Sequence, residues 1–204
     1  MAEINPEREK ILSYTQNKFL SEGFYKTTIE EIARELSMSK NTIYKYFPGK
    51  EELLKACIFD MIEKTRAKID LAISSRSNAI EKLLDILDIL SKTIIRFSDK
   101  FMRDVQIHTP HIWEQIDSIR QKFMYANIVK IIEQGKKENY FRDFPTELIL
   151  TVFISSVRSV VNPAFLLNIK YTAKEAFKIT FEILIRGILT DKGNKIFNNI
   201  KSDQ

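Results

Sequence analysis

Apolar residues recur every three or four positions along most of the chain, which is the spacing of one face of an α-helix. The first such stretch follows Asn5-Pro6, runs through Ile11 and Phe19, and stops at Gly23. Asparagine before a helix, proline at its first position and glycine just past its end are common boundary residues. The pattern therefore predicts a first helix that begins at Pro6 and ends before Gly23.

Two short helices joined by a tight turn are predicted next. The run Thr28-Ile29-Glu30-Glu31 matches a capping box, in which the first hydroxyl and the last carboxylate satisfy backbone N–H groups at the helix start. Ser37-Met38-Ser39 forms the turn, and its last serine suits the cap position of the third helix. In that helix only Ile43 and Phe47 need to face inward.

The remaining chain is predicted to be helical as well, with short polar breaks. The expected segments are 50–70, 80–97, 101–107, 111–139, 146–168 and 172–189, and the polar tail from residue 192 is expected to fray. Pro163 is expected to kink its helix or to end it early. The sequence shows no strand-rich region and no internal repeat, and 5 glycines and 5 prolines are few helix breakers. The chain is predicted to be all-α.

Composition and charge narrow the setting of the protein. The net charge of +5 is compatible with nucleic acid without being diagnostic of it. Cys57 is the only cysteine, so no intrachain disulfide can form, and we expect it to be a small buried residue. The N-terminus lacks an apolar signal core. The apolar run 148–169 carries Arg158 near its middle, which argues against a membrane span. We expect a cytoplasmic protein.

The third predicted helix carries the clearest chemical signal. It offers amines, an amide and hydroxyl groups, and no acidic residue occurs between Ser37 and Lys50. A short helix with such groups and no carboxylate suits phosphate and base edges. Together with the tight turn before it, this helix predicts a helix-turn-helix.

The string TTIEEIARELSMSKNTIYKYFPGKEELL, residues 27–54, resembles the DNA-binding signature of the TetR family of bacterial transcriptional regulators, also called TetR/AcrR. Beyond this part of the chain, only the all-helical layout and the length match the family. The resemblance implies a helix-turn-helix DNA-binding domain over residues 1–50. It further implies a larger helical domain for ligand binding and dimerisation over residues 51–204.

By the same resemblance, particular side chains would contact DNA. Lys40, Asn41 and Thr42 would reach base edges in the major groove, where asparagine can pair with adenine and lysine can donate to guanine. Others would contact phosphate through hydroxyl groups, ammonium groups or helix N-terminal amides, and these are Thr28, Ser39, Tyr44, Lys45, Tyr46 and Lys50. The alternatives are that the tyrosines pack on the first helix and that the lysines are merely solvated.

Two residues depart from the usual pattern of the family. The family commonly has glycine in the turn, where this chain has Ser37, so a positive φ there would strain the serine. Asn41 stands where a small residue is common, which would change the bases that are read.

The resemblance implies that the larger domain binds a small hydrophobic or aromatic effector of unknown identity, without a cofactor. Candidate lining residues are Phe97, Phe101, Met102, Ile107, Trp113, Phe123, Met124 and Tyr125. The last two helices would pair with those of a second copy as a four-helix bundle, with candidate contacts at Val152, Phe153, Val160, Phe177, Phe181 and Leu184. For both sets the alternative is an ordinary internal core. Effector binding would shift the population between two arrangements of the DNA-binding heads.

Enzymes and metal proteins fit the sequence poorly. His108 and His111 precede Glu114 and Asp117 in steps of three residues, but Pro110 interrupts the helix between the histidines. A helix cap or polar surface is therefore favoured over a metal site. The sequence has no other histidine for a nucleophile triad and no glycine-rich phosphate loop, so no catalysis is expected. The remaining alternative is a dimeric ligand-binding helical protein that acts through protein contacts, without sequence-specific DNA binding.

Overall fold

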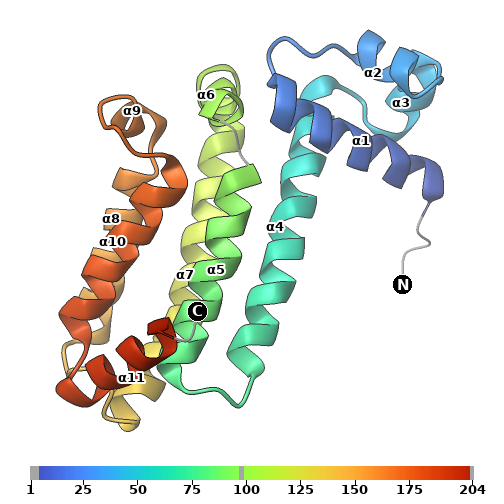
Figure 1. The fold of residues 1–204 in the computed structure, drawn as a ribbon. Coiled ribbons are helices and arrows are strands. Elements are labelled where there is room, and N and C mark those ends of the chain that lie inside the picture. The colour runs from blue at the N-terminus through green and yellow to red at the C-terminus, as the bar shows by residue number, and fades with distance from the viewer. Residues whose placement is uncertain (1–4, 97–98, 203–204) are drawn as a thin grey trace. The chain divides into compact units, whose positions relative to one another are not determined.

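A computed structural model describes residues 5–96 and 99–202, without the side chains of residues 94–96, 99, 100, 120, 124 and 163. Its helices are α1 (Pro6–Glu22), α2 (Ile29–Glu35), α3 (Lys40–Tyr46), α4 (Lys50–Ser74), α5 (Ala79–Arg96), α6 (Asp99–His108), α7 (Pro110–Lys137), α8 (Thr146–Val160), α9 (Pro163–Leu166), α10 (Ala173–Ile188) and α11 (Asp191–Ser202) (Figure 1). Within the described ranges, the only β-structure is an isolated bridge between Phe141 and Leu189. The predicted all-α fold is confirmed.

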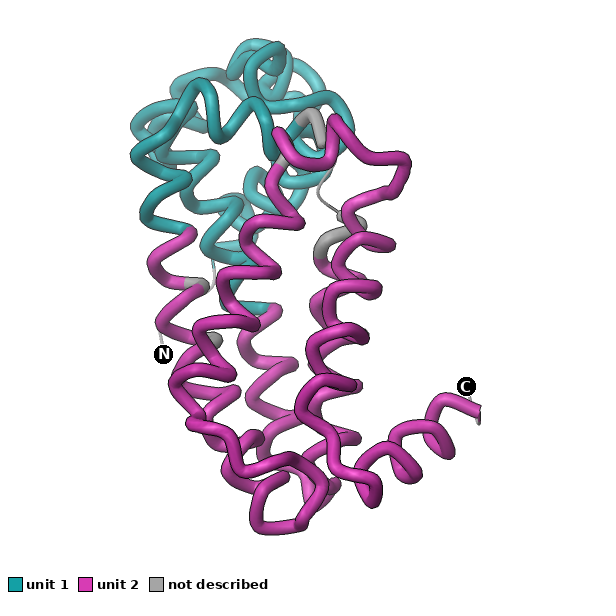
Figure 2. The backbone as a smooth tube through the Cα atoms, turned by 90° about the vertical axis from the view of Figure 1, so that its left-hand side faces the viewer, with its two compact units in different colours: residues 1–64, 96–116 teal, residues 65–95, 117–204 magenta. Residues whose placement is uncertain are grey.

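The chain divides into two compact units, and both α4 and α7 contribute to each of them (Figure 2). Unit 1 comprises residues 1–64 and 96–116, and unit 2 comprises residues 65–95 and 117–204. The two compact units therefore do not divide at residue 50, where the boundary between a DNA-binding and a ligand-binding domain was expected. That functional division stays a prediction.

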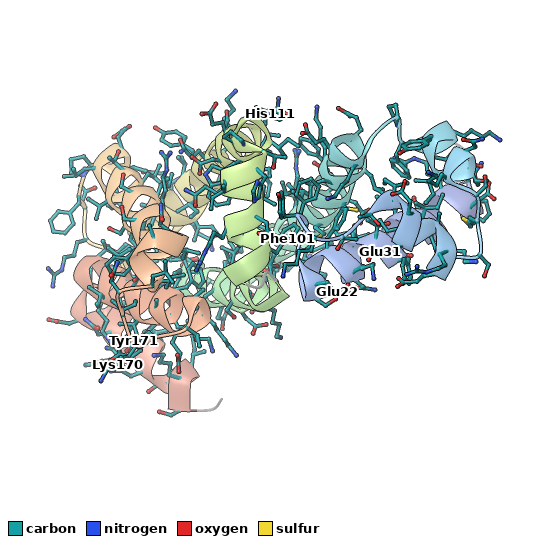
Figure 3. The ribbon with its side chains drawn as sticks, turned by 90° about the horizontal axis from the view of Figure 1, so that it is seen from above. Glu22, Glu31, Phe101, His111, Lys170 and Tyr171 are labelled. Atoms are coloured by element: carbon teal, nitrogen blue, oxygen red, sulfur yellow. The ribbon has the colours of Figure 1, made fainter. Side chains whose placement is uncertain are left out.

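Unit 1 is built on a core to which every one of its helices contributes. Ile11 and Phe19 of α1 meet Ile32 of α2 and Ile43 of α3, and all four side chains are buried. Phe101 of α6 belongs to the same core and lies beside the end of α1 that carries Glu22 (Figure 3). The core therefore joins the two short helices, α2 and α3, to longer ones that can hold them in place.

Unit 2 has its own core, which lies among α5, α7, α8, α10 and α11. Ile80, Leu83 and Ile132 are almost fully buried there, together with Leu150 and Ile185 of the packed pair α8 and α10. Figure 1 shows these two helices side by side. Their apolar sequences therefore bury one face inside the unit.

The predicted helix starts are confirmed in detail. The Asn5 side chain accepts hydrogen bonds from the backbone N–H groups of Glu7 and Arg8, which caps α1. Thr28 and Glu31 form both bonds of the capping box of α2. The Ser39 hydroxyl accepts from the Thr42 N–H at 3.0 Å and caps α3.

Ser37 stands where glycine was expected from the family resemblance. It adopts the left-handed conformation, with φ of 55°. Its N–H donates to the carbonyl of Arg34, and the Met38 N–H donates to the carbonyl of Ala33. These two bonds are the Schellman motif, which ends a helix and usually has glycine at this position. The turn of the helix-turn-helix thus forms with a serine that carries backbone strain.

Two predicted helix ends need correction. The fourth helix was expected to stop near Asp70, but α4 continues to Ser74. The helix expected over residues 146–168 ends at Val160, and Pro163 begins the separate short helix α9. Proline ends the helix early because it has no backbone N–H to donate to the preceding turn.

The tail was expected to fray, but it forms α11. Phe197 of α11 is 1% exposed and packs in the core of unit 2. Gly193 approaches the chain so closely that a β-carbon there would lie 2.2 Å from the Tyr140 carbonyl oxygen. The tail is ordered because this close approach lets a single aromatic side chain bury itself, although the segment around it is polar.

Within the described part of the chain, none of the helices combines the length and the apolar character that crossing a membrane requires.

We predict that Ser37→Gly raises the free energy of unfolding. A residue with a β-carbon is strained by about 1–2 kcal/mol in the left-handed conformation, and glycine removes this strain. Glycine also increases the conformational entropy of the unfolded chain, which offsets part of the stabilisation. The expected net increase in the free energy of unfolding is roughly 0.5–1 kcal/mol. Urea unfolding followed by circular dichroism measures the change. Ser37→Ala is the matched control because it keeps the β-carbon. Equal midpoints for the two variants would contradict the assignment of strain.

Candidate nucleic-acid interface

The third helix has one buried and one exposed face. Ile43 is fully buried and Phe47, which caps the helix C-terminus, is 3% exposed, so both hold α3 against the core as predicted. The side chains of Lys40, Asn41, Tyr44 and Lys45 are exposed, while Thr42 and Tyr46 are partly buried. The polar face of α3 is therefore available to a partner, and its groups are those that suit phosphate and base edges.

Two hydroxyl groups at the helix starts are held in place by local bonds. The Ser39 hydroxyl lies 2.9 Å from the Thr42 hydroxyl and also accepts from the Thr42 backbone. The Thr28 hydroxyl accepts from the Glu31 N–H at 3.2 Å. The backbone N–H and then the hydroxyl of Thr28 also bond to the Glu31 carboxylate and lower the pKa of Glu31, so the hydroxyl is engaged within the capping box.

Lys40 has an acidic neighbour that α3 itself does not supply. Its ammonium group lies 3.0 Å from a carboxylate oxygen of Glu30, the second residue of α2. Both side chains are more than half exposed. The hydrogen bond from Lys40 lowers the pKa of Glu30, and the same bond raises the pKa of Lys40, so both groups are charged at neutral pH.

Tyr46 is held differently from Tyr44, although both were predicted to contact phosphate. The Tyr46 hydroxyl donates to the Glu7 carboxylate at 2.7 Å, and this bond raises the pKa of Tyr46. A phenol has a single proton to donate, so Tyr46 cannot also donate to a phosphate in this arrangement. The Tyr44 side chain is 43% exposed, and its hydroxyl makes no hydrogen bond to another residue of the described chain.

Lys50 is directed inward rather than into solvent. Its ammonium group donates to the carbonyl oxygen of Tyr25 at 3.0 Å and lies 4.4 Å from the centre of the Phe24 ring. Partial burial lowers the pKa of Lys50. Lys50 therefore ties the start of α4 to the segment between α1 and α2.

That segment is held at the same residue by α6. The Tyr25 N–H donates to the Asp104 carboxylate at 3.0 Å, and the Tyr25 ring stacks on His108 with ring centres 4.0 Å apart. Tyr25 is thus held by Asp104 through its N–H, by Lys50 through its carbonyl and by His108 through its ring. Because Thr28 follows three residues later, these contacts also position the start of α2.

A buried lysine fixes the other end of α2. Lys18 of α1 is only 8% exposed and makes ion pairs of 3.0 Å with Glu22 and with Glu35 of α2. The hydrogen bonds to Glu22 and then to Glu35 raise the pKa of Lys18 far above its usual value. Tyr14 also donates to Glu35. Both ends of α2 are therefore anchored to neighbouring segments.

The residues predicted to line an effector site are divided between the two units. Phe101 is buried in the core of unit 1, Trp113 packs against that core, and Met102 of the same unit is partly buried. Phe123 packs against the core of unit 2, while Ile107 and Tyr125 are 62% and 46% exposed. Phe97 and the Met124 side chain lie outside the described residues. The described members include core residues, which the alternative interpretation expected, and surface residues, which it did not, and their role in effector binding stays a prediction.

The residues predicted to form a dimer contact also include internal ones. Phe153, Phe177 and Phe181 are at most 5% exposed, and the Phe181 ring contacts both of the others. Val160 and Leu184 are partly buried. The apolar side chains of α8 and α10 that remain exposed are Leu148, Val152, Ile179 and Ile183. An interface through these helices would use this second set, in which only Val152 was predicted.

The two histidines do not form a joint site. His108 ends α6 and stacks on Tyr25, whereas His111 lies in the first turn of α7 and its ring nitrogen is 3.3 Å from Glu51. Pro110 begins α7 between them. Cys57 is buried, as expected, and burial raises the pKa of its thiol.

Sequence reasoning missed three residues that shape this surface, namely Glu7, Tyr25 and Glu30. Their partners are Tyr46, Lys50 and Lys40, which lie 39, 25 and 10 residues further along the chain. No spacing rule for a helix or turn links such distant positions. The sequence between Ser37 and Lys50 contains no acidic residue, but Glu7 of α1 and Glu30 of α2 bond to side chains of this stretch.

Comparisons with known proteins place this surface in context. Residues 11–57 match the model of the tetR family of bacterial regulatory proteins. The uncharacterized HTH-type transcriptional regulator YvaF of Bacillus subtilis is 22% identical over 185 residues, which cover 90% of this chain and 96% of that protein. The HTH-type transcriptional regulator LmrA of the same species is 40% identical over 63 residues, 30% of this chain and 34% of that protein.

Solved structures share the fold over most of the chain. A transcriptional regulator from Cytophaga hutchinsonii superposes with a TM-score of 0.73 and 22% identity, over 91% of this chain and 100% of that one. The fatty acid degradation regulator FadR from Bacillus halodurans gives a TM-score of 0.66 and 17% identity, over 90% of this chain and 96% of that one. The helix-turn-helix surface thus lies within a fold that solved structures share.

The two tyrosines of α3 give a direct test of this geometry. We predict that Tyr44→Phe lowers the affinity for any DNA duplex about tenfold, because an exposed hydroxyl that donates to a charged phosphate is lost. Tyr46→Phe is the matched variant and should change the affinity less than about twofold, because its hydroxyl serves Glu7. Fluorescence anisotropy with a labelled duplex measures both. A larger loss for Tyr46→Phe than for Tyr44→Phe would contradict the assignment.

Proposed function

Because the chain belongs to the TetR family of bacterial regulatory proteins, we propose that it is a ligand-responsive transcriptional repressor that binds a palindromic operator as a homodimer. Membership of the family makes it a DNA-binding regulator of transcription. Its relatives are regulators rather than enzymes. The repressor role, the operator symmetry, the effector and a cytoplasmic location are parts of the proposal.

The exposed face of α3 is the observation that carries the proposal. Ile43 and Phe47 anchor this helix in the core, so its polar side chains are held at fixed positions on the surface. Lys40, Asn41 and Thr42 lie in the first turn, the part of a recognition helix that reaches base edges in the major groove. We assign base contacts to these three residues.

Phosphate contacts are assigned to exposed side chains of α3 and to exposed residues at the helix starts beside it. Tyr44 and Lys45 are exposed on α3, and the hydroxyl groups of Thr28 and Ser39 are positioned at the helix starts. Tyr46 and Lys50 were also expected to contact phosphate. We instead assign them to positioning, since their hydrogen bonds to Glu7 and to the Tyr25 carbonyl secure α3 and α4.

A dimer follows from the way such a motif reads DNA. A single short helix covers few base pairs, and two heads about 34–36 Å apart read the two halves of a palindrome from one side of the duplex. The outward apolar residues of α8 and α10 supply a surface for a second copy, because a soluble monomer gains nothing from exposing them. Leu148, Val152, Ile179 and Ile183 are the proposed contacts.

The effector site is proposed for the helical domain over residues 51–204. A small hydrophobic or aromatic molecule that fits only one arrangement of the helices would shift the population of dimers away from the spacing that matches DNA. Tyr25 offers a route for such a change, because α6 holds it through Asp104 and His108 and it lies close to the start of α2.

DNA binding has two separable signatures that test the proposal. Duplexes selected from a random library by the wild-type protein define its preferred site. We predict that Asn41→Ala lowers the ratio of affinities for the selected and scrambled duplexes about fivefold or more, while binding to the scrambled duplex is retained. Lys45→Ala should weaken both and reduce the slope of log K against log salt by about 0.9. Unchanged isotherms for both variants would overturn the assignment.

The dimer has its own test. We predict that Ile183→Glu converts the protein to a monomer in sedimentation equilibrium, because the substitution places a charge in the centre of an apolar contact. Leu71→Glu is the matched control, since Leu71 is 74% exposed on α4, outside the proposed interface. A protein that stays dimeric with Ile183→Glu, or that is monomeric without any substitution, would contradict the interface.

A further inference from the structure

One carboxylate lies directly beside a residue that is assigned to read bases. The Glu30 side chain, in the first turn of α2, accepts a hydrogen bond from the Lys40 ammonium group at 3.0 Å. The two side chains are 60% and 53% exposed, so neither is needed to fill the core. The backbones beneath them are fixed, because Ile32 and Ala33 of α2 and Ile43 of α3 are buried in one core.

Other carboxylates of α2 serve different partners. Glu31 bonds to the Thr28 N–H in the capping box, and Glu35 pairs with Lys18 and accepts from Tyr14. Glu30 is therefore the acidic residue of α2 that contacts the exposed side chains of α3, through Lys40. Its carboxylate is charged at neutral pH as glutamates ordinarily are, and the bond from Lys40 lowers its pKa further.

A carboxylate in this place has a cost and a use. It repels the phosphate backbone, so it weakens binding to every DNA sequence. However, a lysine is a compact charge on a flexible stem, and without a second partner it would turn to the nearest phosphate. An ammonium group has three donors, and one bond to Glu30 leaves two for the O6 and N7 atoms of guanine.

We propose that Glu30 is a specificity-determining residue that holds the Lys40 ammonium group toward base edges and away from phosphate. Glu30 acts through Lys40, so it is a positioning residue. This inference rests on the proposed function as a DNA-binding repressor.

The experiment compares Glu30→Gln, Lys40→Ala and the double variant with the full-length wild-type protein. The probes are two labelled duplexes: one that the wild-type protein selects from a random library, and a scrambled version of it. Affinities are measured over a series of salt concentrations. Asp88→Asn is the matched control, because Asp88 and Lys92 form a similarly exposed pair, at 2.5 Å, on α5 of unit 2.

Glu30→Gln should lower the ratio of affinities for the selected and scrambled duplexes about fivefold or more, through tighter binding to the scrambled duplex. The slope of log K against log salt for that duplex should steepen by about 0.9, because Lys40 gains a phosphate contact. In the Lys40→Ala background, Glu30→Gln should leave the ratio unchanged. Asp88→Asn should change none of these quantities.

Glu30→Asp is a second variant that tests the same contact in case Glu30→Gln fails to fold. It keeps the negative charge and the acid in the first turn of α2, but it withdraws the carboxylate from Lys40 by one methylene group. We expect it to lower the ratio as well, and circular dichroism confirms that each variant is folded. A merely structural role would change the helix content or the unfolding midpoint and leave the salt slope unaltered.

The outcomes separate this inference from the proposed function. If the wild-type protein selects no sequence from the library, the proposed function fails. If the wild-type protein selects a site and the folded Glu30 variants keep its ratio and slope, the role of Glu30 is overturned. A ratio that still falls with Glu30→Gln when Lys40 is absent overturns it too, because Glu30 would then act on DNA directly.

Discussion

The recognition surface depends on the burial of two seven-residue helices against longer ones. Helices as short as α2 and α3 are not stable alone. Forming the first turn has an entropy cost that is offset only by the hydrogen bonds of many further residues. Ile32, Ile43 and Phe47 supply the missing stabilisation by packing on α1 and α4. Because these side chains occupy the inner face of each helix, the polar residues can only face outward.

Polar contacts complete what the core begins. Lys18 holds the last turn of α2 to α1 through Glu35, and Tyr25 holds the segment before α2 to α4 and α6. Each of these contacts includes a charged partner, which makes the hydrogen bonds stronger than neutral ones. The strained Ser37 in the turn is tolerated because the elements on both sides are fixed. A rigid surface of this kind suits a partner with the regular geometry of a DNA groove.

The acids around α3 change how its charge is understood. A basic stretch without acids indicates phosphate binding, and the match of residues 11–57 to the model of the tetR family of bacterial regulatory proteins supports that interpretation. In the folded protein, Glu7 and Glu30 nevertheless each bind one donor of the same helix. Such neighbours lower the general attraction to DNA and leave defined donors for particular contacts. Selectivity gains from this arrangement, since specificity is a difference between affinities.

Much of the local structure of this protein can be predicted from the amino-acid sequence. Apolar spacing and the capping residues Asn5, Thr28 and Ser39 fixed where helices begin, because these signals act within one helical turn. The family signature in residues 27–54 also predicted which surface contacts DNA, and that assignment stays a prediction. By contrast, the roles of Tyr46, Lys50 and Lys40 required their distant partners Glu7, Tyr25 and Glu30. The outward face of α8 and α10 and the burial of Phe197 likewise required the tertiary structure. Periodicity shows that a face is apolar, but only the folded chain decides which face it meets and which charged side chains come together.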